Sequence, residues 1–286
     1  MSSPRYRRAA VVGVGLLGGS VAAALRERGL AERVVGVVRT AERARQTEAC
    51  GLVDEATERF AAGVADADLI VVATPVQRIA AQAIAAAAHA APAALVTDVG
   101  STKASIVAAA EAGWPTTDGA PAFVGAHPLA GDHRSGPEAA RADLLDGATV
   151  VVTPTAHTPS EAVERCEALW QALSATVVRL TPDRHDELLA LSSHVPHVAA
   201  SAVAATTPPE ALALAATGWA DTTRVAAGGA ELWRQILLDN PRPVAAGLRR
   251  LAEELGAYAD ALDAADADTL ERLLQLGKDR RDALGS

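Results

Sequence analysis

The sequence predicts an α/β protein in which a doubly wound, mostly parallel Rossmann-type sheet domain is followed by an all-helical dimerisation domain. Apolar strand-like runs alternate with helical runs through the first two thirds of the 286 residues, which is typical of a parallel sheet covered by helices. The first of these runs leads into a G-x-G-x-x-G loop, and beyond residue 181 only helical patterns occur. We therefore expect a dinucleotide-binding domain over residues 1–181 and a helical substrate and dimerisation domain over residues 182–286.

The first predicted unit is a strand, AAVVGV, followed by the glycine loop and the helical run SVAAALRERG. Gly13 permits a tight turn, Gly15 lets a pyrophosphate approach the backbone, and Gly18 allows close packing of helix and strand. Leu16 and Leu17 complete the loop, whose N–H groups face the phosphates. Arginines before an apolar run also fit a secretory signal peptide, but such a peptide needs no glycine spacing and its helix would be weakened by glycine.

The second predicted strand, residues 33–38, ends where a dinucleotide-binding domain usually places a carboxylate for the ribose hydroxyls. Val38 and Arg39 occupy that place. An arginine in the absence of a carboxylate favours the 2′-phosphate of NADP, so we expect NADP or NAD with a preference for NADP. The alternative is that Arg39 is solvated, or stacks on adenine without selecting either cofactor.

Five more strand-like runs follow, and the loops at their carboxyl ends are where a doubly wound sheet binds its ligands. Thr74 and Pro75 follow the third strand and are expected near the cofactor, Ser101 follows the fourth, and His127 lies at the end of the fifth. These five runs are residues 68–74, 94–100, 122–128, 148–154 and 175–181.

The helical part begins with Thr181 as a plausible N-cap and Pro182 at the first helical position. The last forty or so residues read as two amphipathic helices joined near residues 263–268. Wide apolar faces of this kind often pack against a second copy. We expect a homodimer through these helices.

Composition excludes several partners. A formal net charge of −9 argues against nucleic acid and anionic membrane surfaces. The most apolar stretch is mostly alanine and is interrupted by Gln82, His89 and Pro92, so we expect no membrane span. Cys50 and Cys166 form no motif, which suits a reducing compartment and predicts a cytoplasmic protein.

Four motifs together resemble the prephenate/arogenate dehydrogenase family of tyrosine biosynthesis. They are DVGSTK (98–103), GAHPLAG (125–131), SSHVPH (192–197) and GWADTTRVAAGGAELWRQILLDN (218–240), and they stand in the family's order over nearly the whole chain. The resemblance implies an NAD(P)-dependent oxidative decarboxylation of a small cyclohexadienol, prephenate or arogenate. Hydride passes to the nicotinamide, the ring carboxylate leaves as carbon dioxide, and the ring becomes aromatic.

The resemblance also implies roles for residues of the sheet domain. His127 is the expected base for the substrate hydroxyl, because histidine titrates near neutrality. A histidine that caps a buried loop is the alternative. Ser101 is expected near the hydroxyl and the nicotinamide, although it could also cap the helix that follows. Lys103 could reach a carboxylate, but we expect it to be a solvated lysine at the start of that helix.

In the helical domain the resemblance places His194 and His197 at the substrate pocket, with His197 on the substrate side. Pro196 should disturb the helical hydrogen bonds between them. Two histidines three residues apart resemble a metal site, but no third ligand follows, so no metal is predicted. Core histidines bonded to backbone are the alternative. Arg224 is the expected carboxylate clamp, because a guanidinium binds a carboxylate at two points, and its apolar neighbours argue against full exposure.

One departure from the family bears on the substrate. His133 stands where many members have glutamate, so we expect it near the substrate side chain, which is a keto acid in prephenate and an amino acid in arogenate. The choice between these substrates stays open. Another sheet-plus-helix dehydrogenase, such as a 3-hydroxyacid dehydrogenase or an imine reductase, would give HPLAG no role. A catalytically silent NADP-binding regulator would not need His127, Ser101 and Arg224 together.

Overall fold

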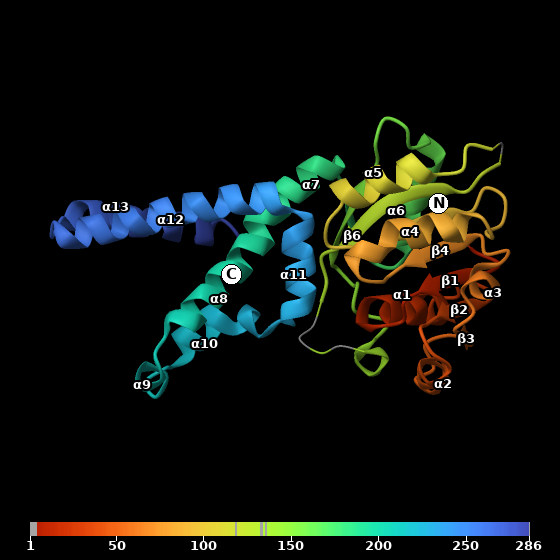
Figure 1. Ribbon diagram of the computed structural model, residues 1–286, viewed down its shortest axis with the longest axis horizontal. Coiled ribbons are helices and arrows are strands. Elements are labelled where there is room, and N and C mark those ends of the chain that lie inside the picture. Colours follow the sequence, from red (N-terminus) through yellow and green to blue (C-terminus); the bar gives the residue numbers. More distant parts are fainter. Residues whose placement is uncertain (1–4, 118, 132–133, 135, 286) are drawn as a thin grey trace.

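The computed structural model describes residues 5–117, 119–131, 134 and 136–285. It consists of a sheet domain and a helical domain, and the helices extend away from the sheet as two arms (Figure 1). The predicted fold class is therefore confirmed.

The sheet domain is built on one eight-stranded sheet with the order β3-β2-β1-β4-β5-β6-β7-β8. Among the strands of the described residues, only β6 and β7 pair in antiparallel fashion, while β7 and β8 are parallel to each other. Every predicted run contains a strand, and the structure adds β3, a three-residue strand that the sequence analysis missed. The strands are β1 (Ala9–Val12), β2 (Val34–Val37), β3 (Glu55–Thr57), β4 (Leu69–Val72), β5 (Leu95–Asp98), β6 (Ala122–Pro128), β7 (Thr149–Thr153) and β8 (Thr176–Arg179).

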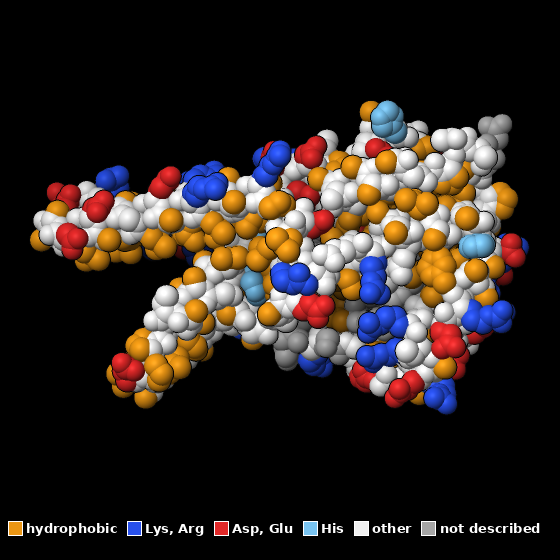
Figure 2. All heavy atoms as spheres, in the orientation of Figure 1, with side chains coloured by type: hydrophobic (Ala, Val, Ile, Leu, Met, Phe, Trp, Pro, Cys, Tyr) orange, Lys and Arg blue, Asp and Glu red, His pale blue; other side chains and the backbone are white. Residues whose placement is uncertain are grey.

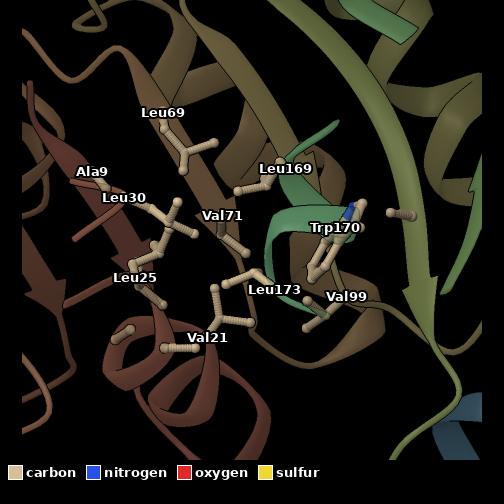
Figure 3. Close-up of a cluster of buried hydrophobic side chains, with 14 of the residues drawn as sticks. Ala9, Val21, Leu25, Leu30, Leu69, Val71, Val99, Leu169, Trp170 and Leu173 are labelled. Carbon is tan, nitrogen blue, oxygen red and sulfur yellow. The ribbon is translucent and has the colours of Figure 1, made fainter. Parts of the chain in front are cut away.

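Helices cover both faces of this sheet, which explains why β1 and β4 are apolar throughout. In β4, Leu69 and Val71 belong to one buried cluster, whereas Ile70 and Val72 belong to the other. Figure 3 shows the first cluster, where side chains of α1 and α6 meet the sheet around Trp170. The helices of this domain are α1 (Leu16–Glu27), α2 (Ala41–Ala49), α3 (Phe60–Val64), α4 (Val76–Ala87), α5 (Ala104–Gly113), the 3-10 turn η1 (Pro137–Ala139) and α6 (Ser160–Ala172).

The helical domain begins as predicted, with the Thr181 hydroxyl accepting from the Arg184 N–H and Pro182 opening α7. The hydrogen-bond ladder is irregular just before Pro196, where residues Ala190–His194 form a π-helical turn. The elements are α7 (Pro182–Leu189), the π-turn η2 (Ala190–His194), α8 (Val195–Thr206), α9 (Pro209–Leu212), α10 (Thr217–Thr223), the 3-10 turn η3 (Arg224–Ala227), α11 (Ala230–Asp239), α12 (Pro241–Asp263) and α13 (Ala267–Asp282).

The two arms expose long apolar faces. Apolar side chains follow the edge of α12 and α13 that faces the other arm, and charged side chains follow the opposite edge (Figure 2). Exposed leucines of these two helices include Leu255, Leu262 and Leu274. A single chain leaves these faces in water, which is typical of an interaction surface.

One continuous helix, Pro182–Thr206, joins α7, η2 and α8 at the centre of the helical domain. The helix is long enough to cross a membrane, and an 18-residue window of it has a mean hydropathy of 1.4. A third of that window is buried inside the protein. The core helix of a soluble domain has the same length and composition. Its buried face bears Asp186, His194 and His197, polar groups that contact neighbouring elements of this chain.

Candidate active site

The glycine loop has the shape that a dinucleotide requires. Gly13 has a φ of 91°, and a Cβ on it would lie 2.6 Å from the Ala73 carbonyl oxygen. A Cβ on Gly18 would lie 2.0 Å from the Gly13 oxygen, so only glycine allows this packing of helix and strand. At Gly15 nothing lies within 4 Å of an added Cβ, and no side chain caps the start of α1 there. The first turn of α1, with the half-buried Leu16, is therefore open to an anion and fits a pyrophosphate.

Neighbouring strand ends complete this edge of the sheet. Thr74 follows β4, and its methyl group would lie 2.8 Å from a Cβ on Gly13, so it borders the glycine loop. Pro75 is exposed at the start of α4, and Leu17 is half-buried within the first turn of α1. These residues lie beside the loop, as expected of cofactor contacts, and their roles remain predictions.

The end of β2 presents a guanidinium and no carboxylate over residues 38–40. Val38 is buried, and its N–H donates to the Thr57 oxygen at 2.9 Å. Arg39 is exposed and makes no hydrogen bond or ion pair with the described residues. Thr40 caps α2 by accepting from the Arg43 N–H at 3.2 Å.

A buried carboxylate organises the DVGSTK loop. Asp98, at the end of β5, accepts from the Gly100 N–H at 2.7 Å, from the Ala126 N–H at 3.1 Å and from the Lys103 ammonium. Lys103 also donates to the Ala126 oxygen at 2.9 Å. Our expectation of a solvated Lys103 is therefore wrong, because the side chain is completely buried and paired. Burial lowers the pKa of Lys103, and Asp98 opposes that change.

Ser101 does not cap the helix that follows it. Helix α5 begins at Ala104, and the carboxylate of Asp186 accepts from the N–H groups of Lys103 and Ala104 at 2.8 and 2.9 Å. The capping alternative for Ser101 is thus wrong. Ser101 is half-buried and makes no hydrogen bond with the described residues, which is consistent with its predicted place beside substrate and nicotinamide.

His127 lies near the end of β6 and is joined to a second histidine. Its Nδ1 is 2.9 Å from Nε2 of His185, whose Nδ1 is 2.8 Å from Oδ1 of Asp186. All three side chains are buried. Burial lowers the pKa of His127 well below its usual value, and His185 and Lys103 add to this effect. His127 is therefore neutral at pH 7 and has a lone pair that can accept a proton, but it does not titrate near neutrality as the sequence analysis expected.

His194 and His197 lie on the same helical stretch but differ in their surroundings. Nδ1 of His194 is 3.3 Å from the amide nitrogen of Asn240, which donates, so His194 is neutral. Burial lowers its pKa to about 4. The His197 ring stacks on Trp233 with centroids 3.5 Å apart and an interplanar angle of 12°. Its buried Nδ1 has no partner among the described residues, as expected of an atom that awaits a ligand.

Arg224 opens the 3-10 turn η3 and is exposed in the single chain, without a hydrogen bond or ion pair to Asp221 or any other described residue. The expected shielding by its apolar neighbours is therefore not seen. The turn still borders the histidines, because a Cβ on Gly228 would lie 3.1 Å from His197 Cε1 and 2.5 Å from the Trp233 nitrogen. His133 lies outside the described residues.

The structure thus joins His127 to a pair that the sequence analysis missed, and no direct contact joins His127 to His197 or Arg224 among the described residues. In the sequence His185 lies four residues before Leu189, which places both on one face of the predicted helix and is only a weak signal for this pair; the burial of both side chains is seen only in the structure. Within the described part of the chain, no group of three histidine, cysteine or acidic side chains is placed to hold a metal.

These features define a class of protein, the two-domain nicotinamide-dependent dehydrogenases. The features are a glycine loop shaped for a pyrophosphate, a buried neutral histidine at the end of a nearby strand, and a helical second domain.

Comparison with known protein families identifies the family of dehydrogenases to which this chain belongs. Residues 21–179 match the nucleotide-binding domain of prephenate dehydrogenase, and residues 181–276 match its dimerization domain. These two models cover most of the chain. The chain belongs to the prephenate dehydrogenase family and is an oxidoreductase of that family.

Individual relatives agree with this membership. The prephenate dehydrogenase of Bacillus subtilis is 34% identical over 96% of this chain and 75% of that protein. The cyclohexadienyl dehydrogenase of Zymomonas mobilis is 29% identical over 93% of this chain and 92% of that protein.

Solved structures show the same architecture. The prephenate dehydrogenase of Aquifex aeolicus in complex with hydroxyphenyl propionate and NAD+ superposes with a TM-score of 0.88 at 27% identity, covering 99% of this chain and 100% of that chain. The arogenate dehydrogenase of Synechocystis gives a TM-score of 0.81 at 30% identity, covering 97% and 99% of the two chains.

Proposed function

We propose that this protein is a prephenate dehydrogenase that converts prephenate to 4-hydroxyphenylpyruvate with NAD(P)+ in tyrosine biosynthesis. The observation that carries this proposal is the placement of His127. It is buried, neutral and located at the carboxyl end of a strand, on the edge where the dinucleotide loop lies. Family membership supplies the substrate class.

In this proposal His127 removes the hydroxyl proton as the ring carbon loses hydride. The bound nicotinamide supplies the hydride acceptor. Nδ1 of His127 is engaged with His185, so Nε2 is the atom that takes the proton. General base help of this kind is worth about 10²–10⁴ in rate. Ser101 donates to or accepts from the same hydroxyl without adding charge.

Residues of the helical domain bind the substrate carboxylates in this proposal. Arg224 is exposed and unpaired within the described chain, so its guanidinium is available as a two-point carboxylate clamp. The free Nδ1 of His197, held on the face of Trp233, is a second polar contact for the substrate. His194 is bonded to Asn240 and supports its neighbours.

Arogenate is the second candidate substrate. The similarity of this chain to an arogenate dehydrogenase of known structure supports it as a candidate. The two substrates differ only in the side chain, where His133 is the predicted contact. An imidazole can donate to or accept from either side chain, whereas a glutamate would favour the ammonium group of arogenate. This favours prephenate.

The loop after β2 supports a preference for NADP+ over NAD+. Arg39 is exposed and free to pair with a 2′-phosphate, and the buried Val38 offers no acceptor to ribose hydroxyls. We also propose that two copies cover the apolar faces of α12 and α13 with each other in a cytoplasmic homodimer. The match to the family's dimerization domain supports this arrangement.

The experiment is a steady-state assay of the purified protein with prephenate and with arogenate, each with NAD+ and with NADP+. Reduction of the nicotinamide is followed by absorbance, and carbon dioxide release is measured in parallel. The proposal expects the highest kcat/KM with prephenate. Faster turnover of arogenate would select the second candidate. A folded, cofactor-binding protein that turns over neither substrate would instead be a silent regulator.

A further inference from the structure

We infer that His185 and Asp186 are positioning residues that fix the tautomer of His127, so that its Nε2 is the unprotonated atom offered to the substrate. This inference rests on the proposed role of His127. The geometry that carries it is a chain of two hydrogen bonds, from His127 Nδ1 to His185 Nε2 at 2.9 Å and from His185 Nδ1 to Asp186 Oδ1 at 2.8 Å.

The direction of each bond follows from the acceptor at the end of the chain. Both carboxylate oxygens of Asp186 face backbone N–H groups, from Lys103 at 2.8 Å and Ala104 at 2.9 Å, and neither N–H can accept. Asp186 therefore acts as an acceptor, and His185 must donate to it from Nδ1. In this inference His185 carries a single proton, on Nδ1, and its Nε2 therefore has a lone pair.

The same logic sets the proton on His127. Its Nδ1 faces the lone pair of His185 Nε2, so it must donate and carries the proton. Its Nε2 is then the lone-pair atom. The opposite tautomer would place two lone pairs 2.9 Å apart between two buried rings, where little solvent relieves the repulsion.

The remaining titratable groups around His127 do not supply this function. Lys103 is bonded to Asp98 and the Ala126 oxygen, and His194 accepts from Asn240. Among the described residues, Asp186 is thus the carboxylate that side-chain hydrogen bonds link to His127. When Nε2 of His127 gains a proton, Nδ1 of His127 still donates to His185 and His185 still donates to Asp186, so the chain of hydrogen bonds stays intact.

Because Asp186 belongs to α7, the catalytic tautomer is set across the domain boundary. The base stands on the sheet domain, and the groups that orient it stand on the helical domain. A dinucleotide domain alone would hold His127 without the partner that fixes its ring.

A matched pair of variants separates positioning from packing. Gln at position 185 has an oxygen that accepts from His127 and an amide that donates to Asp186, whereas Met has nearly the same length and neither group. We expect His185→Met to lower kcat with prephenate about tenfold or more while KM for prephenate and Kd for the cofactor change little. We expect His185→Gln to recover most of that loss. Equal kcat in the two variants, with equal thermal unfolding, would overturn the inference.

Ring 15N NMR of histidine-labelled protein reports the tautomer without any turnover, with His127→Asn used to assign the signals among the seven histidines. We expect His127 with the proton on Nδ1 in the wild type and in His185→Gln, and a mixture in His185→Met. A wild-type His127 with the proton on Nε2 would overturn the inference even if the variants do not fold. A protein with the expected tautomer but no activity toward either cyclohexadienol would refute the proposed function instead.

Discussion

Asp186 of α7 accepts from the backbone N–H of Lys103 at 2.8 Å and so caps a helix that belongs to the other domain. Asp239 of α11 makes a second link to the same turn, with 2.5 Å bonds from the hydroxyls of Thr102 and Ser105. Two carboxylates of the helical domain thus hold the start of α5, directly after Ser101. The position of the loop that carries Ser101 therefore depends on how the two domains pack.

This packing predicts the effect of Asp239→Ala. The buried Thr102 hydroxyl would lose its partner, and hydrogen bonds to charged groups contribute about 1.5–3 kcal/mol each. We expect the free energy of unfolding to fall by roughly 2 kcal/mol in denaturant titration at fixed protein concentration. Glu253→Ala, at an exposed position of α12, is the control and should change little. Equal stability of both variants would show that this link contributes nothing.

The buried His194 predicts a loss of stability in acid. Its pKa is about 4 in the folded protein against about 6.5 when unfolded, so between these values the unfolded chain binds a proton that the folded chain does not. Stability therefore falls as pH falls from 6.5 toward 4, by about 1.4 kcal/mol per pKa unit at most. His194→Gln keeps an acceptor for Asn240 and should flatten this part of the curve. An unchanged slope would contradict the buried, neutral state of His194.

Arg224→Ala should raise KM for prephenate by at least tenfold with a smaller effect on kcat. A carboxylate clamp contributes mostly uniform binding, which steady-state kinetics detects as a change in KM. Arg224→Lys should recover only part of the loss, since an ammonium cannot bind at two points. Arg250→Ala, another exposed arginine, is the control. If KM stays at the wild-type value in Arg224→Ala, this arginine does not contact the substrate.

The cofactor preference is tested at the end of β2. A charge-assisted bond to the 2′-phosphate is worth roughly 1.5–3 kcal/mol, or about ten- to a hundredfold in affinity. Arg39→Ala should therefore reduce the kcat/KM ratio of NADP+ to NAD+ by about tenfold. Val38→Asp with Arg39→Ala should reverse the preference, because the new carboxylate binds ribose hydroxyls and repels phosphate. Arg45→Ala, exposed on α2, is the control. A wild type that already prefers NAD+ would refute the role of Arg39.

Local patterns were enough to predict most of the fold. Alternating apolar runs gave seven of the eight strands, because a strand buried on both faces needs a continuous apolar stretch. The missed strand β3, with the sequence EAT, has no such stretch and forms only by pairing with β2. The antiparallel pairing of β7 was also missed, since apolar patterning does not specify strand direction.

The site was predictable only in part, because some of its contacts join residues that are far apart in the sequence. His127 and Ser101 stand at strand ends, where topology alone places ligands. Lys103 is buried because Asp98, five residues earlier, and the Ala126 oxygen satisfy its ammonium. Asp186 contacts Lys103 from 83 residues away. In the sequence, the polar first turn of α7 looks like a solvated helix start, and only the packing of the two domains reveals its role.

The central claim is that His127 is the proton acceptor for hydride transfer, and His127→Asn tests it most directly. Asparagine keeps a polar group of similar size and cannot take the proton at neutral pH. We expect the variant to fold and to bind the cofactor with unchanged Kd, and its kcat with prephenate to fall by at least about a hundredfold, since general base catalysis contributes about 10²–10⁴. A folded His127→Asn variant with nearly full kcat would contradict the account.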